Sequence, residues 1–232
     1  MAFSGLSIVL PAYNEAENIQ KVLESALRII RDVGGEVLVV DDGSDDQTAE
    51  LVTSYPSSQV RLVRHSHNRG YGAALRSGFG AARYDWIFFT DADGQFNLQQ
   101  IYDLISHSQS YDLVVGFRAQ RKDPNIRLLN AWVWAKLVNT TFGLSIVDVN
   151  CAFKLIRADS LRSITLFSEG ACINAEMFVK LLERGARLKQ VPVEHFPRSH
   201  GRQTGARPDV ILRALRELIS LRAGSDNGVR KP

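Results

Sequence analysis

The 232-residue sequence has only two cysteines and no long apolar run. Cys151 and Cys172 stand alone without metal-type spacing, so we expect two buried thiols in a reduced, cytoplasmic protein. No stretch approaches ~20 apolar residues, which argues against a transmembrane helix. The first five residues lack a basic start and the apolar run at residues 7–11 is short, so no signal peptide is expected.

Known phosphate-binding loops are also missing. No Gly-x-Gly-x-x-Gly follows the first expected strand and no Walker lysine is present, which argues against dinucleotide oxidoreductases and P-loop enzymes. Aromatic-interleaved basic motifs are absent, so nucleic acid is not an expected partner. The net charge of +3 hides a basic end. Residues 184–232 hold 11 basic and 4 acidic side chains, which favours a phosphate or an anionic membrane face as partner.

Apolar patterning predicts an α/β fold with a mostly parallel, doubly wound sheet and flanking helices. We expect strands at residues 6–10, 37–40, 60–63, 86–90 and 113–116. Helices are expected between them, the first over residues 15–33 with Asn14 as its N-cap. After Arg118 the alternation breaks, and we expect an apolar helix at 128–142, a strand at 152–156, a helix at 173–184, a strand at 188–193 and an amphipathic helix at 210–221.

The stretch that organises the chain is the apolar strand at residues 86–90, which ends in Asp91 and Asp93. Ligands of open α/β sheets collect beyond the carboxyl ends of the strands. Two carboxylates so close together repel unless a cation lies between them, and oxygen ligands select Mg²⁺ or Mn²⁺. Gln95 could add a neutral oxygen. The alternative is a solvated turn, since Asp and Gly favour turns.

Two other strands of the same expected sheet also end in polar residues, so their side chains should face one cleft. Tyr13 offers a ring for stacking on a nucleobase, and Glu15 could accept hydrogen bonds from the ribose or the base. Asp42 can accept from a base N–H. A cation at Asp91 and Asp93 would bridge a diphosphate, and arginines would complete the charge balance.

Four blocks carry a family resemblance: SIVLPAYNE (residues 7–15), VVDDGS (39–44), NRGYGAALRSGF (68–79) and TDADGQ (90–95). Together they resemble family 2 glycosyltransferases of the GT-A fold, in particular dolichyl- or polyprenyl-phosphate mannose and glucose synthases. The resemblance covers residues 5–222. It implies an inverting, metal-dependent transfer from a GDP- or UDP-sugar to a polyprenyl phosphate. It also implies one domain at 1–222, with a nucleotide-sugar half at 1–118 and an acceptor half at 119–222, before a disordered tail at 223–232.

The resemblance assigns roles to individual residues. The metal ligands would be Asp91, Asp93 and Gln95. The catalytic residues would be Asp91, Asp93, Arg118, which neutralises phosphate, and Asp148. The nucleotide-sugar would be bound by Pro11, Tyr13, Glu15, Val40, Asp42, Asp91, Ala92, Arg118, Arg127 and, on a basic closing loop, Arg198 and Arg202. Gln203-Thr204 and the segment VNCAFK (149–154) depart from the usual pattern, which leaves the acceptor open.

A lipid phosphate needs no general base, whereas a hydroxyl acceptor would need one. Base candidates are Asp148, Glu169 and Glu176, each of which could instead be a structural cap or ion pair. The segment 128–142, with Trp132 and Trp134, is either a peripheral membrane contact on the cytoplasmic face or a core helix. The five histidines show no ligand spacing and are interpreted as polar surface or loop residues. A nucleotidyltransferase and a non-catalytic nucleotide-sugar binding module are the other hypotheses.

Overall fold

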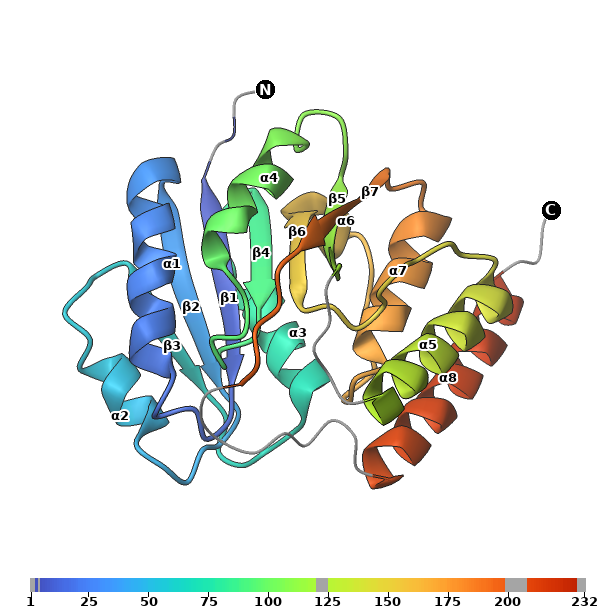
Figure 1. Cartoon of the computed structure of the whole chain (residues 1–232), viewed down its shortest axis with the longest axis horizontal. Coiled ribbons are helices and arrows are strands. Elements are labelled where there is room, and N and C mark those ends of the chain that lie inside the picture. The colour runs from blue at the N-terminus through green and yellow to red at the C-terminus, as the bar shows by residue number, and fades with distance from the viewer. Residues whose placement is uncertain (1–2, 4, 120–124, 199–207, 229–232) are drawn as a thin grey trace.

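The computed structural model describes residues 3, 5–119, 125–198 and 208–228. Its centre is a seven-stranded sheet with strand order β3-β2-β1-β4-β6-β5-β7 (Figure 1). The strands are β1 (Leu6–Ala12), β2 (Gly35–Asp41), β3 (Val60–Arg64), β4 (Trp86–Thr90), β5 (Leu113–Arg118), β6 (Phe153–Arg157) and β7 (Leu188–Val193). Within the described residues only β6 runs antiparallel to its neighbours. The mostly parallel α/β sheet is therefore confirmed.

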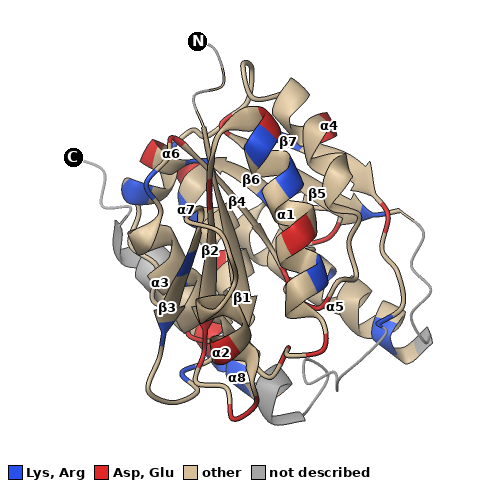
Figure 2. Ribbon diagram, turned by 90° about the vertical axis from the view of Figure 1, so that its left-hand side faces the viewer, with Lys and Arg blue, Asp and Glu red and all other residues tan. Residues whose placement is uncertain are grey.

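The sheet is covered on both faces (Figure 2). The helices α1 (Ile19–Val33) and α4 (Ile101–Ser106) lie on one face, and α3 (Tyr71–Ala81), α6 (Ala158–Arg162) and α7 (Ile173–Glu183) lie on the other. Double coverage explains why β1 and β4 are mostly apolar and are buried at every position. The short helix α2 (Thr48–Thr53) and the 3₁₀ turn η1 (Leu98–Gln100) sit in the connections.

The first helix begins four residues later than expected. The predicted cap, Asn14, has φ 55°, a left-handed conformation that cannot start a helix. Its backbone N–H donates to Ser44 Oγ at 2.9 Å, and the N–H of Glu15 donates to Thr48 Oγ1 at 2.9 Å. These contacts hold the chain after β1 against the loop after β2, so the helix starts only at Ile19.

The strand expected at 152–156 is β6, and it separates β4 from β5. It pairs antiparallel with both, and Lys154 lies opposite Phe89 on one side and Val115 on the other. A simple alternating order would place β5 next to β4, but β6 lies between them. Lys154 lies in the middle of the sheet and is fully buried.

Two helices lie side by side beyond the sheet, α5 (Asn125–Phe142) and α8 (Pro208–Gly228) (Figure 1). The helix α8 continues to Gly228, so the expected start of a disordered tail at 223 falls inside it; no proline interrupts it before Pro232. Residues 229–232 lie outside the described residues. Within the described residues, no helix combines the length and apolarity needed to cross a bilayer.

Candidate active site

The carboxyl ends of β2, β1 and β4 lie at one edge of the sheet, because these three strands are parallel neighbours. Ala12 at the end of β1 is opposite Asp41 at the end of β2. Acidic residues gather where these strands end, at the lower end of the sheet in Figure 2. The predicted clustering of polar strand ends is therefore what the fold produces, and we call this set of loops the acidic edge (residues 13–15, 41–46 and 91–95).

Asp91 and Asp93 follow β4 directly. Burial and, to a smaller extent, the charge of Asp93 raise the pKa of Asp91 to about 7, against a hydrogen bond with Tyr71 that lowers it. Burial also raises the pKa of Asp93, against a 3.1 Å hydrogen bond from the backbone N–H of Gln95 to its Oδ1. Two neighbouring carboxylates with raised pKa values are typical of a cation-binding site, because a bound cation removes the repulsion between their charges.

Arg198 reaches this pair from the far end of the chain. Its Nη2 lies 2.5 Å from Glu15 Oε1 and its Nη1 lies 3.6 Å from Asp93 Oδ2. The preceding residues are fixed to the loop after β4, because Phe196 N–H donates to Gln95 O and Gln95 Nε2 donates to Phe196 O, both at 2.8 Å. Arg198 thus lies beside Glu15 and Asp93, and its binding of a diphosphate stays a prediction.

Glu15 is buried beside this arginine. Burial raises its pKa above the ordinary value, while a 2.7 Å hydrogen bond from Asn18 Nδ2 and the charge of Arg198 lower it. The carboxylate is thus already engaged on both oxygens. Each oxygen keeps a second lone pair, so the carboxylate can accept a further hydrogen bond while both partners stay in place.

The donor set suits a divalent cation. Asp91, Asp93 and Gln95 offer hard carboxylate and amide oxygens, which Mg²⁺ and Mn²⁺ prefer. Gln95 uses its Nε2 as a donor to Phe196 O, which leaves Oε1 as its acceptor end. Among the described residues, no three or more His, Cys, Asp or Glu side chains are grouped so that they could hold a metal ion. An open site of this kind fits a cation that takes its remaining ligands from substrate phosphates.

Asp42 and Tyr13 lie at the end of the acidic edge that was predicted to bind the nucleoside. Tyr13 is 40% exposed, so its ring is accessible for stacking. The side chains of Pro11, Val40 and Ala92 are buried. Asp42 is buried and accepts hydrogen bonds from the backbone N–H groups of Arg69, at 3.0 Å, and Gly70, at 2.8 Å. A polar hollow of about 470 Å³ opens next to it, lined by Gly43, Ser44, Asp45, Arg64, His65 and Ser66.

His65 was expected to be a polar surface or loop residue, and it lies in the loop after β3 but is buried. The ring is only 7% exposed, and its Nδ1 lies 2.6 Å from Asp42 Oδ1 while its Nε2 lies 2.8 Å from Ser77 Oγ. No spacing signal marks this contact, because Asp42, His65 and Ser77 come from three separate parts of the chain. Its position just after β3 was the one available hint.

Arg118 and Asp148 bind each other. Arg118 Nε donates to Asp148 Oδ2 at 2.7 Å and Nη2 donates to Oδ1 at 2.8 Å. The pair is mostly buried, and the charge of Arg118 lowers the pKa of Asp91, which places it electrostatically within the acidic edge. The structure thus brings together two of the predicted catalytic residues. A carboxylate held by an arginine fork is a poor proton acceptor.

Lys154 was missed by sequence reasoning. Its ammonium donates to Val149 O at 3.3 Å and Asn174 Oδ1 at 2.9 Å, and also to Cys151 O. Burial lowers its pKa to about 8, and the nearby carboxylates oppose that shift. These bonds shape the turn that follows Asp148. A lysine inside an apolar strand was the visible signal.

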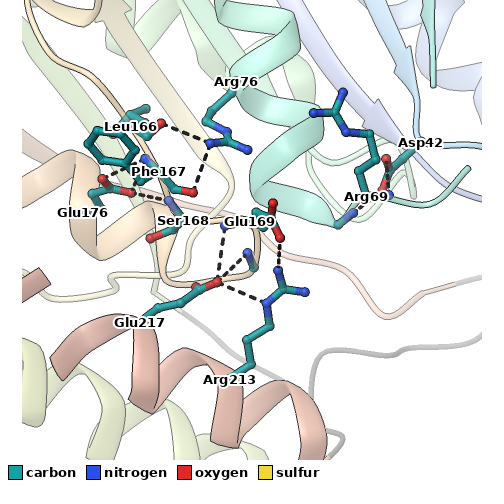
Figure 3. A network of polar contacts seen from close by, with 12 residues as sticks. Asp42, Arg69, Arg76, Leu166, Phe167, Ser168, Glu169, Glu176, Arg213 and Glu217 are labelled. Carbon is teal, nitrogen blue, oxygen red and sulfur yellow. Dashed lines mark hydrogen bonds and ion pairs between the residues drawn. The ribbon is translucent and has the colours of Figure 1, made fainter. Parts of the chain in front are cut away.

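A second polar network joins the acidic edge to α8 (Figure 3). The N–H of Gly72 donates to Glu169 O at 2.7 Å, and Arg213 and Glu217 of α8 bind the same turn. A Cβ on Gly72 would lie 2.4 Å from Ser168 O, so the glycine is needed for this close approach. Glu176 accepts from the backbone of residues 167 and 168 and pairs with Lys180. Both former base candidates, Glu169 and Glu176, are therefore structural.

Two predicted arginines remain. Arg127 lies in the first turns of α5, next to the gap at residues 120–124. Arg202 lies outside the described residues, so its predicted role stays a prediction. Cys151 and Cys172 are both free and buried, as expected.

Comparison with known proteins tests the resemblance. The profile described as Glycosyl transferase family 2 matches residues 7–165. The chain belongs to this family. Undecaprenyl-phosphate 4-deoxy-4-formamido-L-arabinose transferase of Pectobacterium atrosepticum is 30% identical over 204 residues, which cover 84% of this chain and 61% of that protein. Dolichyl-phosphate beta-glucosyltransferase of Dictyostelium discoideum is 31% identical over 213 residues, with 81% and 65% covered. The chain thus spans less than two thirds of either relative.

A solved structure confirms the fold of this family 2 member. Glucosyl-3-phosphoglycerate synthase from Mycobacterium tuberculosis, crystallised in complex with Mn²⁺ and uridine-diphosphate-glucose, matches with a TM-score of 0.75 at 21% identity. The match covers 96% of this chain and 80% of that one. The fold is therefore GT-A, as the resemblance implied.

Proposed function

We propose that this chain transfers a hexose, with inversion and with a divalent metal ion, from a GDP- or UDP-sugar to a polyprenyl phosphate at the cytoplasmic face of a membrane. The observation that carries the proposal is the acidic edge next to two helices with exposed apolar faces. Both polyprenyl-phosphate transferases named above are relatives at about 30% identity, which supports the lipid phosphate as acceptor.

The donor binds along the acidic edge. The base stacks on Tyr13 and gives an N–H to Asp42, and the ribose meets Glu15. Mg²⁺ or Mn²⁺, held by Asp91, Asp93 and Gln95, supplies neutralising charge at the diphosphate when bound. Arg198 turns from Glu15 and Asp93 to the diphosphate, where its guanidinium stabilises the charge that develops.

The transfer itself needs little from the protein beyond positioning. A phosphate oxygen of the lipid attacks C1 of the sugar, the bond from C1 to the diphosphate oxygen breaks, and the nucleoside diphosphate leaves with the electron pair. The attacking phosphate is already ionised, so no proton must be removed. This agrees with the engagement of Asp148 by Arg118, which leaves that carboxylate unsuited to act as a base.

The apolar faces of α5 and α8 suit a lipid acceptor. In α5, Ile126, Leu129 and Val133 are 49–62% exposed and recur at helical spacing, and Trp132 is 64% exposed. In α8, Leu212, Leu215 and Ile219 repeat the same i, i+3, i+7 pattern and are also exposed. Helices of this kind insert shallowly into the bilayer interface, and tryptophan favours that depth.

Labelled sugar transfer tests the proposal. Vesicles that contain undecaprenyl phosphate should accept label from a UDP- or GDP-hexose with Mn²⁺, and vesicles with the corresponding polyprenol should not. Asp93→Asn should abolish transfer. Asp103→Asn, at an exposed position of α4, should leave transfer unchanged. Transfer to polyprenol equal to transfer to the phosphate would contradict the assignment, because a hydroxyl acceptor needs a base.

A second candidate keeps the donor chemistry and uses a soluble acceptor. It is favoured by the fold match to glucosyl-3-phosphoglycerate synthase. Transfer to 3-phosphoglycerate in the absence of vesicles would select it over the lipid acceptor.

A further inference from the structure

The carboxylate of Asp42 has a countable number of acceptor positions. An ionised carboxylate offers about four lone-pair sites, two on each oxygen. Oδ1 already faces His65 Nδ1 at 2.6 Å and accepts from Arg69 N–H at 3.0 Å, while Oδ2 accepts from Gly70 N–H at 2.8 Å. Figure 3 shows Asp42 beside Arg69. Among the contacts of the described residues, one acceptor position is left, and it is on Oδ2.

His65 occupies one of the acceptor positions on Asp42 Oδ1. Only a ring nitrogen that carries a proton can face a carboxylate at 2.6 Å, so Nδ1 is the donor to Oδ1. The other ring nitrogen lies 2.8 Å from Ser77 Oγ on α3, and burial of the ring prevents it from turning into water. The histidine therefore occupies Oδ1 whether or not a nucleotide is bound.

The nucleobases differ in what they need from such a carboxylate. Guanine presents two adjacent donors, N1–H and the N2 amino group, which pair with both oxygens of one carboxylate. Uracil presents a single donor, N3–H, between two carbonyls. Cytosine has an acceptor at N3 and cannot donate there.

We infer that the nucleoside site selects uracil over guanine and that His65 sets this selection by occupying Asp42 Oδ1. The inference rests on the proposed function, in which Asp42 accepts the N–H of the base. The donor is then a UDP-sugar. His65 acts through Asp42 and is a positioning residue.

Nucleotide binding to the full chain tests this inference. Calorimetric titration with UDP, GDP and CDP in the presence of Mn²⁺ should give at least about tenfold tighter binding for UDP than for GDP, and CDP should bind weakest. His65→Leu removes the donor to Oδ1 and should reduce the ratio of GDP to UDP dissociation constants about tenfold, the effect of one hydrogen bond to a charged group. His65→Asn, which restores a donor of similar reach, should recover the selectivity.

Ser77→Ala is the matched control, because it leaves Nδ1 on Asp42 and should keep the preference for UDP. Equal binding of UDP and GDP by the wild-type protein would overturn the inference, and so would full selectivity in a folded His65→Leu variant. If His65→Leu does not fold, the wild-type ratio decides alone. Absence of binding by all three nucleotides would instead refute the proposed function.

Discussion

Asp91→Asn should stabilise the protein while it destroys activity. With the pKa of Asp91 at about 7 in the folded chain and 3.8 as the ordinary value, the folded state holds a proton that the unfolded state has released between these pH values. Stability therefore falls as pH rises from about 4 to 7, and this loss is complete above pH 7. The difference of about three between the pKa values of the folded and unfolded states corresponds to ~4 kcal/mol of unfolding free energy. Partial contact of Asp91 with water reduces the expected gain of the variant to about 2–3 kcal/mol.

Urea denaturation in EDTA measures this difference. The free energy of unfolding of Asp91→Asn should exceed that of the wild type at pH 8, and the two should converge near pH 4. Mn²⁺ with UDP should narrow the gap at pH 8, because a bound cation stabilises only the ionised site. A variant that is less stable than the wild type at pH 8, or a gap that does not change with pH, would refute the reasoning about the acidic pair.

Three further predictions concern other parts of the molecule. Without nucleotide, Arg198→Ala should bind Mn²⁺ several-fold more tightly, because the variant lacks the cationic side chain that competes for Asp93. It should bind UDP about tenfold more weakly, because the diphosphate loses its arginine. Paramagnetic resonance measures the first affinity and calorimetry the second, and a change of both affinities in the same direction would contradict the model of a shifting arginine. Gly72→Ala should lower the free energy of unfolding by about 1–3 kcal/mol, since its Cβ would meet Ser168 O, whereas Gly80→Ala in the same helix, with open space around it, should not destabilise. Trp132→Glu should weaken sedimentation with anionic vesicles by about tenfold or more, and Trp132→Phe should not; equal sedimentation of both variants would remove α5 from the membrane contact.

Several features could be predicted because they depend on residues close together in the chain. Each of the strands β1, β2 and β4 is a short apolar run, and the polar residues that follow it belong to the same local segment. Parallel order then requires those ends to share one edge. This is why Asp91, Asp93 and Asp42 could be assigned to one edge of the sheet from the sequence.

The start of α1 shows where local reasoning failed. Asn14 and the acidic residues after it suit a helix N-terminus, but the contacts from Asn14 to Ser44 and from Glu15 to Thr48 hold them in a loop. Helix propensity is a weak preference, and two long-range hydrogen bonds outweigh it.

The sequence by itself determined the kind of chemistry, since apolar strands that end in carboxylates create an oxygen-rich edge wherever the sheet forms. The tertiary structure alone decided the partners of those carboxylates. Arg198 meets Glu15 across 183 residues, His65 meets Asp42 across 23, and Arg118 meets Asp148 across 30. Such pairs depend on which strands become neighbours, as β3 does of β2 and β6 of β5. Side-chain charge and spacing do not specify that order.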